Sequence, residues 1–317
     1  SFGCPKPYSS PNPMSAISFA KTYGGTSYDW AFSVQQTSDG GYIVAGKTVS
    51  FVAGNWDIFL IKTDANGNIQ WAKTYVITDD DEAYSVQQTS DGGYIVAGHT
   101  YHFGAGDRDI FLIKIDANGN IQWAKTYGGG SYDYASSVQQ TSDGGYIVAG
   151  YTDSFGADGF DLFLIKTDAN GNVIWAKTYG GTRGDWAFSI RQTSDGGYIV
   201  AGSTDSFSAG WSDFFLIKTD ANGNVQWAKT YGGTDEDWAE SVHQTSDGGY
   251  IVAGYTRSFG AGNYDAFLIK TDANGNIQWA KTYGGTYWDD ASSVHQTSDG
   301  GYIVAGRTYS FGAGYAN

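Results

Sequence analysis

Two short segments of this chain are apolar at nearly every position. The first covers residues 42–48, Tyr-Ile-Val-Ala-Gly-Lys-Thr, and the second covers residues 57–63, with the apolar centre Ile-Phe-Leu-Ile. A strand that is covered on both faces is apolar almost continuously, whereas a strand with one face in water alternates apolar and polar residues. The pattern therefore predicts interior strands, and no segment has the 3.6-residue period of an amphipathic helix.

The same pattern returns at a constant interval along the chain. The decapeptide Thr-Ser-Asp-Gly-Gly-Tyr-Ile-Val-Ala-Gly begins at Thr37 and occurs six times, with a step of 52 residues and no insertion or deletion. A fixed period of this length indicates a repeat architecture. The aspartates that mark the six copies are Asp39, Asp91, Asp143, Asp195, Asp247 and Asp299.

Each unit is expected to form four short strands joined by tight turns. Asp39-Gly40-Gly41 is a hairpin signal, and 46 glycines with 16% aromatic residues favour an all-β fold. Four-stranded units that are covered on both faces and stacked radially predict a six-bladed β-propeller. In the first unit the expected strands cover residues 33–37, 42–48, 57–63 and 69–75.

Both ends of the chain are expected to build the sixth blade. Its first two strands come from residues 293–308, and in the phase of the repeat both Asn317 and Pro5 align with Asp265. We expect a further strand at 17–23 and a degenerate one at 6–11, so that the ring closes without an open edge. Residues 1–16 form a separate Pro-rich arm, and residues 17–317 form the propeller.

The repeated sequence resembles a known group of proteins. Its pattern is Asp-x-Phe-Leu-Ile-Lys-x-Asp-x-x-Gly-x-x-x-Trp-Ala-Lys-Thr-Tyr-Gly-Gly, then Asp-x-Ala-x-Ser-Val, then Asp-Gly-Gly-Tyr-Ile-Val-Ala-Gly. This pattern is similar to the β-propeller repeats of secreted and surface proteins in bacteria and archaea, and it covers residues 17–317. The resemblance implies the fold, and it implies extracellular binding, adhesion or surface structure.

Charge and composition exclude several classes of partner. The formal charge of −15 repels nucleic acid, because phosphate binding needs lysine and arginine. The chain has no apolar run of 18 residues that would span a membrane. Residues 1–16 lack the basic start and apolar segment of a signal peptide, so a mature secreted form is expected. The single cysteine, Cys4, allows no internal disulfide and is a candidate for pairing between chains.

Aspartates at fixed positions offer two interpretations. One set precedes the first strand of every unit, where a ring of carboxylates at a channel mouth would attract a cation, although each could equally cap a turn. The strand-three aspartates and the Asp-Ala-Asn-Gly-Asn loops, which start like a calcium loop but lack its glycine and glutamate positions, are expected to be structural. We therefore expect no cofactor, with calcium as the open alternative. The possible ion ring is Asp29, Asp81, Asp133, Asp185, Asp237 and Asp289, and the strand-three set is Asp57, Asp109, Asp161, Asp213 and Asp265.

No catalytic set emerges from the sequence, so a non-enzyme is expected. The four histidines, His99, His102, His243 and His295, have no metal-ligand spacing. His243 and His295 occupy equivalent positions in adjacent units, where other units have glutamine or Arg191.

Function is expected where the units differ. Two variable loops place aromatic residues beside Asp, Asn or Gly, a combination that suits sugars and protein partners, although packing between blades would also explain it. The candidate binding residues are Trp30, Trp56, Tyr134, Phe160, Trp186, Trp211, Trp238, Tyr264 and Trp288.

Two functions remain open at this point. The first is a non-catalytic structural or adhesive protein of the cell surface, which associates with copies of itself into a filament or layer, or with a cell-surface partner. The second is a multivalent, lectin-like module, in which weak sites around a ring would gain avidity on a repeated glycan.

Overall fold

The computed structural model describes residues 20–51, 55–77, 80–101 and 103–311, and every regular element in them is a β-strand. Five antiparallel sheets have four strands each, and a sixth sheet has two. We call these sheets blades one to six in chain order.

Blade one contains β1 (Asp29–Gln36), β2 (Tyr42–Thr48), β3 (Asp57–Thr63) and β4 (Ile69–Tyr75). Blade two contains β5 (Asp81–Gln88), β6 (Tyr94–Tyr101), β7 (Arg108–Ile115) and β8 (Ile121–Tyr127). Blade three contains β9 (Asp133–Gln140), β10 (Tyr146–Thr152), β11 (Asp161–Thr167) and β12 (Val173–Tyr179). Blade four contains β13 (Asp185–Gln192), β14 (Tyr198–Thr204), β15 (Asp213–Thr219) and β16 (Val225–Tyr231). Blade five contains β17 (Asp237–Gln244), β18 (Tyr250–Thr256), β19 (Asp265–Thr271) and β20 (Ile277–Tyr283). Blade six contains β21 (Asp289–Gln296) and β22 (Tyr302–Thr308).

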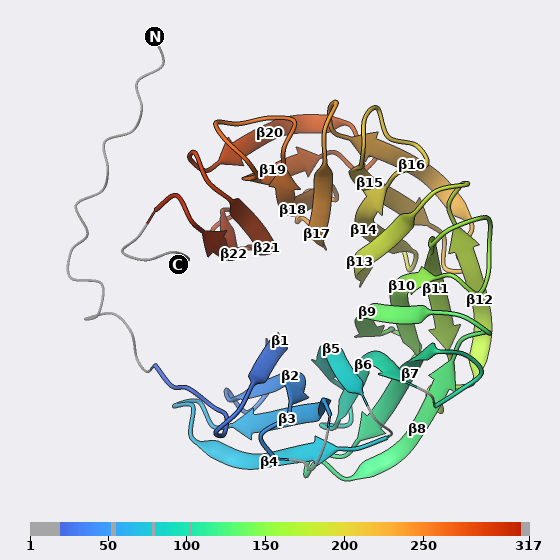
Figure 1. The fold of residues 1–317 in the computed structure, drawn as a ribbon, viewed down its shortest axis with the longest axis vertical. Helices are drawn as coiled ribbons and strands as arrows, with labels where there is room; N and C mark the ends of the chain where they lie inside the picture. Colours follow the sequence, from blue (N-terminus) through green and yellow to red (C-terminus); the bar gives the residue numbers. More distant parts are fainter. Residues whose placement is uncertain (1–19, 52–54, 78–79, 102, 312–317) are drawn as a thin grey trace.

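The blades stand around a common centre (Figure 1). In each blade the strands are paired in chain order, and the first strand, such as β1, β5 or β9, lies nearest the centre while the fourth lies at the periphery. This arrangement agrees with the expected all-β, radially stacked repeat.

The strand limits agree with the sequence except in the first strand. That strand was expected to begin at Ser33, but β1 begins at Asp29, which pairs with Thr48. A bulge between Ala31 and Ser33 breaks the alternation of the side chains, so the pattern conceals the first half of the strand. The expected hairpin at Asp39-Gly40-Gly41 is present, with a five-residue loop, because Gln36 pairs with Tyr42.

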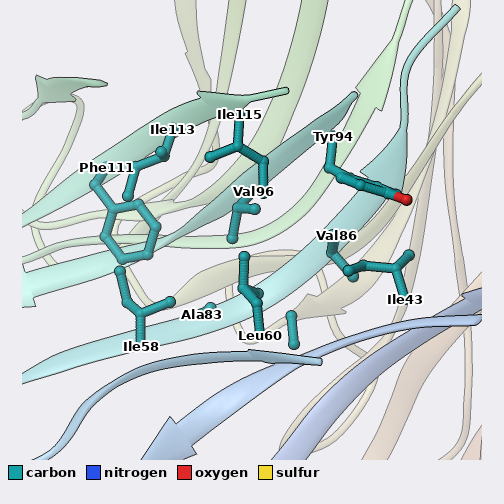
Figure 2. Packing of buried hydrophobic residues seen from close by; sticks show 11 residues of the cluster. Ile43, Ile58, Leu60, Ala83, Val86, Tyr94, Val96, Phe111, Ile113 and Ile115 are labelled. Atoms are coloured by element: carbon teal, nitrogen blue, oxygen red, sulfur yellow. The ribbon is translucent and has the colours of Figure 1, made fainter. Parts of the chain in front are cut away.

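The core lies between neighbouring blades. Side chains from blade one, among them Ile43, Ile58 and Leu60, pack against Val96 and Phe111 of blade two (Figure 2). Each of these five residues is at most 1% exposed. Burying a side chain of this size contributes roughly 1.5–3 kcal/mol, so the apolar character of the second and third strands on both faces stabilises the stacking of the blades.

Polar contacts also join the inner strands of neighbouring blades. The backbone N–H of Ser38 donates to the side-chain oxygen of Gln88 on the next blade at 2.7 Å, and the N–H of Val86 donates to the hydroxyl of Ser33 at 3.2 Å. Equivalent pairs link all five junctions from blade one to blade six. We call these pairs the Ser–Gln links.

A buried lysine fixes the hairpin loop of blades one to five. In blade one, Nζ of Lys62 lies 2.8 Å from the Asp39 carboxylate, and the lysine side chain is only 4% exposed. The Asp39 carboxylate also accepts hydrogen bonds from Thr37 Oγ1 and from the N–H of Gly41 at 2.5 and 3.0 Å. The Lys62 ammonium and these donors hold the pKa of Asp39 well below its usual range.

The sixth blade has two strands among the described residues, and the segments expected to complete it lie mostly outside them. In the part of the chain that the structure describes, β22 pairs only with β21, and most of β22 is exposed, whereas the equivalent β14 is buried throughout. Residues 20–23 are not part of a sheet, contrary to the expected strand, because no described strand lies beside them to pair with. The expected strand at 6–11, the arm 1–16 and Cys4 lie outside the described residues.

Residues 20–23 nevertheless contact blade one as an outer strand of a preceding blade would. The Tyr23 hydroxyl donates to the Gly67 carbonyl at 2.7 Å, and the Lys21 ammonium donates to the Asn68 side chain. The outer strand β4 makes the same contact with blade two, where the Tyr75 hydroxyl donates to the Gly119 carbonyl at 2.7 Å.

Candidate binding site at the central channel

The inner strands enclose a channel with two cavities along its length. All six inner strands run in the same direction, from an aspartate such as Asp29 to a glutamine such as Gln36. A cavity of about 700 Å³ lies nearer the start of these strands, and one of about 870 Å³ lies nearer their end. We call them the first cavity and the second cavity. Each is lined by residues of all six inner strands.

Aromatic rings surround the first cavity and continue along its rim. Successive ring centroids, which lie on all six blades, are 4.6–6.4 Å apart, within the range of aromatic pairs. We call this series the aromatic belt. In order it contains Trp56, Trp30, Phe32, Tyr84, His99, Tyr134, Tyr151, Phe188, Trp238, Tyr255 and Trp288.

The strand bulge and one glycine place these rings. The bulge inserts Phe32 as an extra residue opposite the register Ala31↔Gly46 and Ser33↔Ala45, and Phe32 lines the first cavity. Bulges commonly redirect a side chain in this way. A Cβ at Gly46 would lie 1.8 Å from the Trp30 carbonyl oxygen, so the close approach of the strands at the bulge requires glycine.

Pairs of oppositely charged side chains lie beside the rings of the belt. Lys47 Nζ lies 2.9 Å from Glu82 and 4.4 Å from the ring centroid of Trp56. The Tyr84 hydroxyl donates to the same glutamate at 2.8 Å. Because Lys47 and Glu82 are 14% and 13% exposed, their pair is shielded from solvent salt more than a surface pair would be.

Further charged groups lie on blade six and on blade two. Arg307 Nη2 lies 2.8 Å from Asp290, and the Trp288 indole N–H donates to Asp290 at 3.1 Å. On blade two, the Arg108 guanidinium donates to the Tyr134 hydroxyl at 3.2 Å. The belt therefore combines aromatic faces with both signs of charge.

Two titratable side chains of the first cavity have shifted pKa values. His99 is 4% exposed, its Nδ1 has no hydrogen-bond partner among the described residues, and burial lowers its pKa to about 4. Glu240 is half-buried, and burial together with the Asp290 charge raises its pKa to about 7. At neutral pH the histidine is uncharged and the glutamate is partly protonated, so this cavity offers donors and acceptors.

The structure brings most of the predicted binding residues together in pairs. Among them, Trp30 and Trp56 are 6.3 Å apart, and Tyr264 and Trp288 are 4.3 Å apart. The other pairs are Tyr134 with Phe160 and Trp186 with Trp238. Trp211 is 72% exposed and makes none of the ring contacts found among the described residues.

The aspartates before the first strands each accept a hydrogen bond from a backbone N–H group of the preceding turn. Asp133 is fully buried and accepts hydrogen bonds from Gly129 N–H at 2.8 Å, Ser154 Oγ at 2.7 Å and Thr152 Oγ1. None of the six aspartates lines either channel cavity. The hydrogen bonds support the turn-capping alternative, and the possible ion ring at Asp29, Asp81, Asp133, Asp185, Asp237 and Asp289 stays a prediction.

The other aspartates of the repeat are also engaged locally. The Asp64 carboxylate accepts from the N–H groups of Asn66 and Asn68, both at 2.8 Å, within its own turn. The strand-three residue Asp161 is 2% exposed and accepts from Ala157 N–H at 2.6 Å. No group of three or more His, Cys, Asp or Glu in the described part of the chain could hold a metal ion.

Sequence reasoning missed the belt residues at two strand positions. Phe32, Tyr84 and Phe188 occupy one of them, and Lys47 and His99 belong to the other. The missed signal is variation within otherwise constant strands, since the residue between Ala and Ser in Asp-x-Ala-x-Ser and the residue after Ile-Val-Ala-Gly change from unit to unit. The same rule identifies Glu240, Tyr151, Tyr255 and Arg307.

Comparison with known proteins supports the fold. Residues 89–121 match the model of a family described as a domain of unknown function (DUF5122) β-propeller. The chain is a β-propeller repeat protein by this match and by its blades. It is also 28% identical over 198 residues, 54% of the chain, to the regulatory protein FlaEY of Caulobacter vibrioides. The matched part spans about one fifth, 20%, of that protein's length.

Solved structures align with this chain at low sequence identity. The WD40 domain of Neurospora crassa Pan2 aligns with a TM-score of 0.51 and 11% identity, over 86% of this chain and 85% of that one. Sqt1 of Chaetomium thermophilum aligns with a TM-score of 0.49 and 13% identity, over 87% of this chain and 66% of that one. Among the described residues there is no helix with the length and hydropathy needed to cross a bilayer.

Proposed function

We propose that this protein is an extracellular, non-catalytic binding module whose aromatic belt binds glycans. The observation that carries the proposal is the belt itself, which surrounds a cavity of about 700 Å³ in an otherwise uniform repeat. Ligand sites commonly have this size and this mixture of apolar walls with a few polar groups.

The chemistry of the belt suits a sugar ring. Aromatic faces pack against the C–H faces of a pyranose, and neighbouring hydroxyls need both donors and acceptors. Tyr84 and Phe188 line the cavity with aromatic rings, and the carboxyl of Glu240 supplies a polar group. A fully apolar ligand would leave this carboxyl unpaired at a cost of about 1–3 kcal/mol.

The test uses substitutions that the repeat itself contains. Tyr84→Ser and Phe188→Ser introduce the residue found at the equivalent positions Ser136 and Ser292. Both variants should fold and should lose at least tenfold in affinity for the best ligand of a glycan array. Trp211→Ala, which changes an exposed ring outside the belt, is the control and should bind as the parent does. Equal binding by all three variants would overturn the proposal.

A structural or adhesive role is the second candidate, and it is favoured by the sheet of blade six, where β22 pairs only with β21 among the described residues. Ile303 on β22 is 62% exposed and Val304 is 38% exposed. An unpaired strand edge can accept an extended segment from another chain. We propose that this edge is completed either by the N-terminal segment, which would close the sixth blade as expected, or by a second copy of the chain in a filament or layer.

Light scattering separates these outcomes for the full chain. Particles that grow with protein concentration, and that dissociate when Val304→Lys charges the exposed strand, support association. Single propellers at every concentration would leave the glycan-binding proposal alone.

A further inference from the structure

The second cavity contains a position at which the six blades differ in an ordered way. Three consecutive blades have glutamine there, at Gln35, Gln87 and Gln139. The next three have Arg191, His243 and His295. All six residues line the cavity of about 870 Å³. The basic and imidazole side chains are therefore gathered on one side of the channel.

The three glutamines have a structural task that the other three residues do not share. The side-chain oxygens of Gln35 and Gln87 accept the backbone N–H groups of Gln88 and Gln140 on the next blade at 2.6 Å. A guanidinium has no acceptor, so Arg191 cannot replace this contact. Packing of the blades thus explains glutamine at this position but gives no reason for arginine.

The arginine is held in place without a carboxylate partner. Its Nη1 donates to the Ile190 carbonyl at 2.8 Å, and its Nε donates to His243 Nε2 at 3.3 Å. The rings of His243 and His295 are 4.1 Å apart, which places the second imidazole beside the first. Among the described residues no Asp or Glu oxygen lies within 4.0 Å of the guanidinium. Nη2 of Arg191 has no hydrogen bond to another described residue.

The surroundings of the arginine favour an anion. The chain carries a formal charge of −15, yet no acidic residue lines the second cavity. The hydroxyl-bearing residues Ser142 and Ser194 line it beside Arg191. Arg191 is partly buried in the channel wall. Because a positive charge partly withdrawn from water is unfavourable without a counter-charge, a bound anion would supply the missing partner.

We propose that Arg191, with His243 and His295, forms a binding site for a small oxyanion, a carboxylate, phosphate or sulfate group, in the second cavity. A guanidinium can bind two oxygens of such a group through parallel N–H donors. Because His243 Nε2 accepts from Arg191, its Nδ1 carries the proton and is a donor. This site is separate from the aromatic belt and does not depend on the proposed glycan binding.

The repeat provides matched variants for the test. Arg191→Gln installs the residue that Gln35, Gln87 and Gln139 already use, so the blade should fold as its neighbours do. Arg257→Gln removes an exposed arginine that lies 3.6 Å from Asp235 and is the control. The full chain and both variants are titrated with sodium phosphate, sulfate and acetate at constant ionic strength, by calorimetry and by thermal unfolding. The three salts distinguish the sources of the oxyanion.

The parent and Arg257→Gln should show saturable binding of at least one oxyanion and a rise in Tm that follows it. Arg191→Gln should bind at least about tenfold more weakly, as expected when a charged hydrogen bond is lost. His243→Gln and His295→Gln should each weaken binding to a smaller extent. Equal oxyanion affinities of the parent and Arg191→Gln would overturn the proposal. The absence of saturable binding by the parent would overturn it as well. Glycan binding by Arg191→Gln should be unchanged.

Discussion

The indole of Trp186 lies against the indole of Trp238 on the next blade, with ring centroids 5.5 Å apart and planes inclined by 18°. Trp238 also stacks on Phe188 at 5.7 Å and on Tyr255 at 6.3 Å. One side chain thus joins rings from two blades at the channel mouth.

Trp238→Ala should therefore destabilise the fold and disturb the belt. We expect a loss of about 2–4 kcal/mol in the free energy of unfolding, at the lower part of the range for large-to-small changes because Trp238 is half-buried. Urea denaturation measures this loss. Near-ultraviolet circular dichroism should also lose the coupling signal of the stacked indoles. Trp211→Ala, at a 72% exposed ring, should change neither.

Asp91→Ala tests the buried lysine of the hairpin loop. The substitution leaves Lys114, which is 5% exposed, without its carboxylate partner. We expect the free energy of unfolding to fall by about 2–3 kcal/mol. This is less than for a fully buried pair, because Asp91 is itself 54% exposed. Asp299→Ala is the matched control, since Asp299 accepts from Thr297 and Gly301 but has no lysine partner among the described residues. A loss at Asp299 as large as that at Asp91 would contradict a role for the ion pair.

The same pair predicts the acid limb of the stability curve. Burial acts against ionisation of Asp91, but its hydrogen bonds with Thr89 and Lys114 outweigh this effect and lower its pKa to about 2 from 3.8. A lowered carboxyl pKa gives stability that is present above pH 4 and is lost as the pH falls towards 2. The free energies of unfolding of the parent and of Asp91→Asn should therefore differ most above pH 4 and become similar near pH 2. A constant difference over this interval would be inconsistent with the shifted pKa.

Glu240 should have the opposite effect on stability. Its pKa is raised from 4.5 to about 7 by burial and by Asp290, so the folded state binds the proton more tightly than the unfolded state does. Stability is then lost as the pH rises from 4.5 to 7. Glu240→Gln removes this loss. The free energy of unfolding of the variant should therefore exceed that of the parent by at most about 3 kcal/mol above pH 7. Thermal unfolding of both proteins at pH 4 and pH 8 measures this difference in stability. The same difference at both pH values would contradict the raised pKa.

Asp133→Ala tests the structural role of the aspartates before the first strands. The substitution leaves donors of Gly129, Ser154 and Thr152 without their acceptor, at a cost of about 1–3 kcal/mol. Asp133→Asn keeps one acceptor and should cost less. Calorimetric unfolding provides the measurement, and a variant with full stability would mean that the carboxylate has another role.

The sequence predicted the blades well because the same local signals occur six times. Continuous apolar runs located β2 and β3, and the turn residues at Asp39 and Asp64 located the hairpins. The start of β1 was missed because the bulge at Phe32 interrupts the alternation on which the prediction depends. Blade six was expected to close with residues 6–11 and 17–23; because residues 1–19 lie outside the described residues, this closure stays a prediction.

The site was predicted only in part, for a different reason. Trp30 and Trp56 were predicted because they are aromatic residues in loops that differ between units. Tyr84 and His99 lie inside strands whose sequence is otherwise constant. Their place in the belt depends on which strand lies innermost and on contacts between blades, such as the 4.6 Å separation of the Phe32 and Tyr84 rings. Such contacts join residues of different strands and cannot be read from the pattern of one unit.

The Ser–Gln links have a consequence for how such a ring could change its ligand. They use backbone N–H groups and side chains that the five junctions from blade one to blade six share, such as Ser38 with Gln88, and none of them involves the variable residues of the first cavity. The spacing of the inner strands is therefore independent of what they present to the channel. Residues can be exchanged between equivalent positions of different units, as in a combinatorial library with a constant frame, and recombination between the near-identical repeats would generate new channel linings without a new fold.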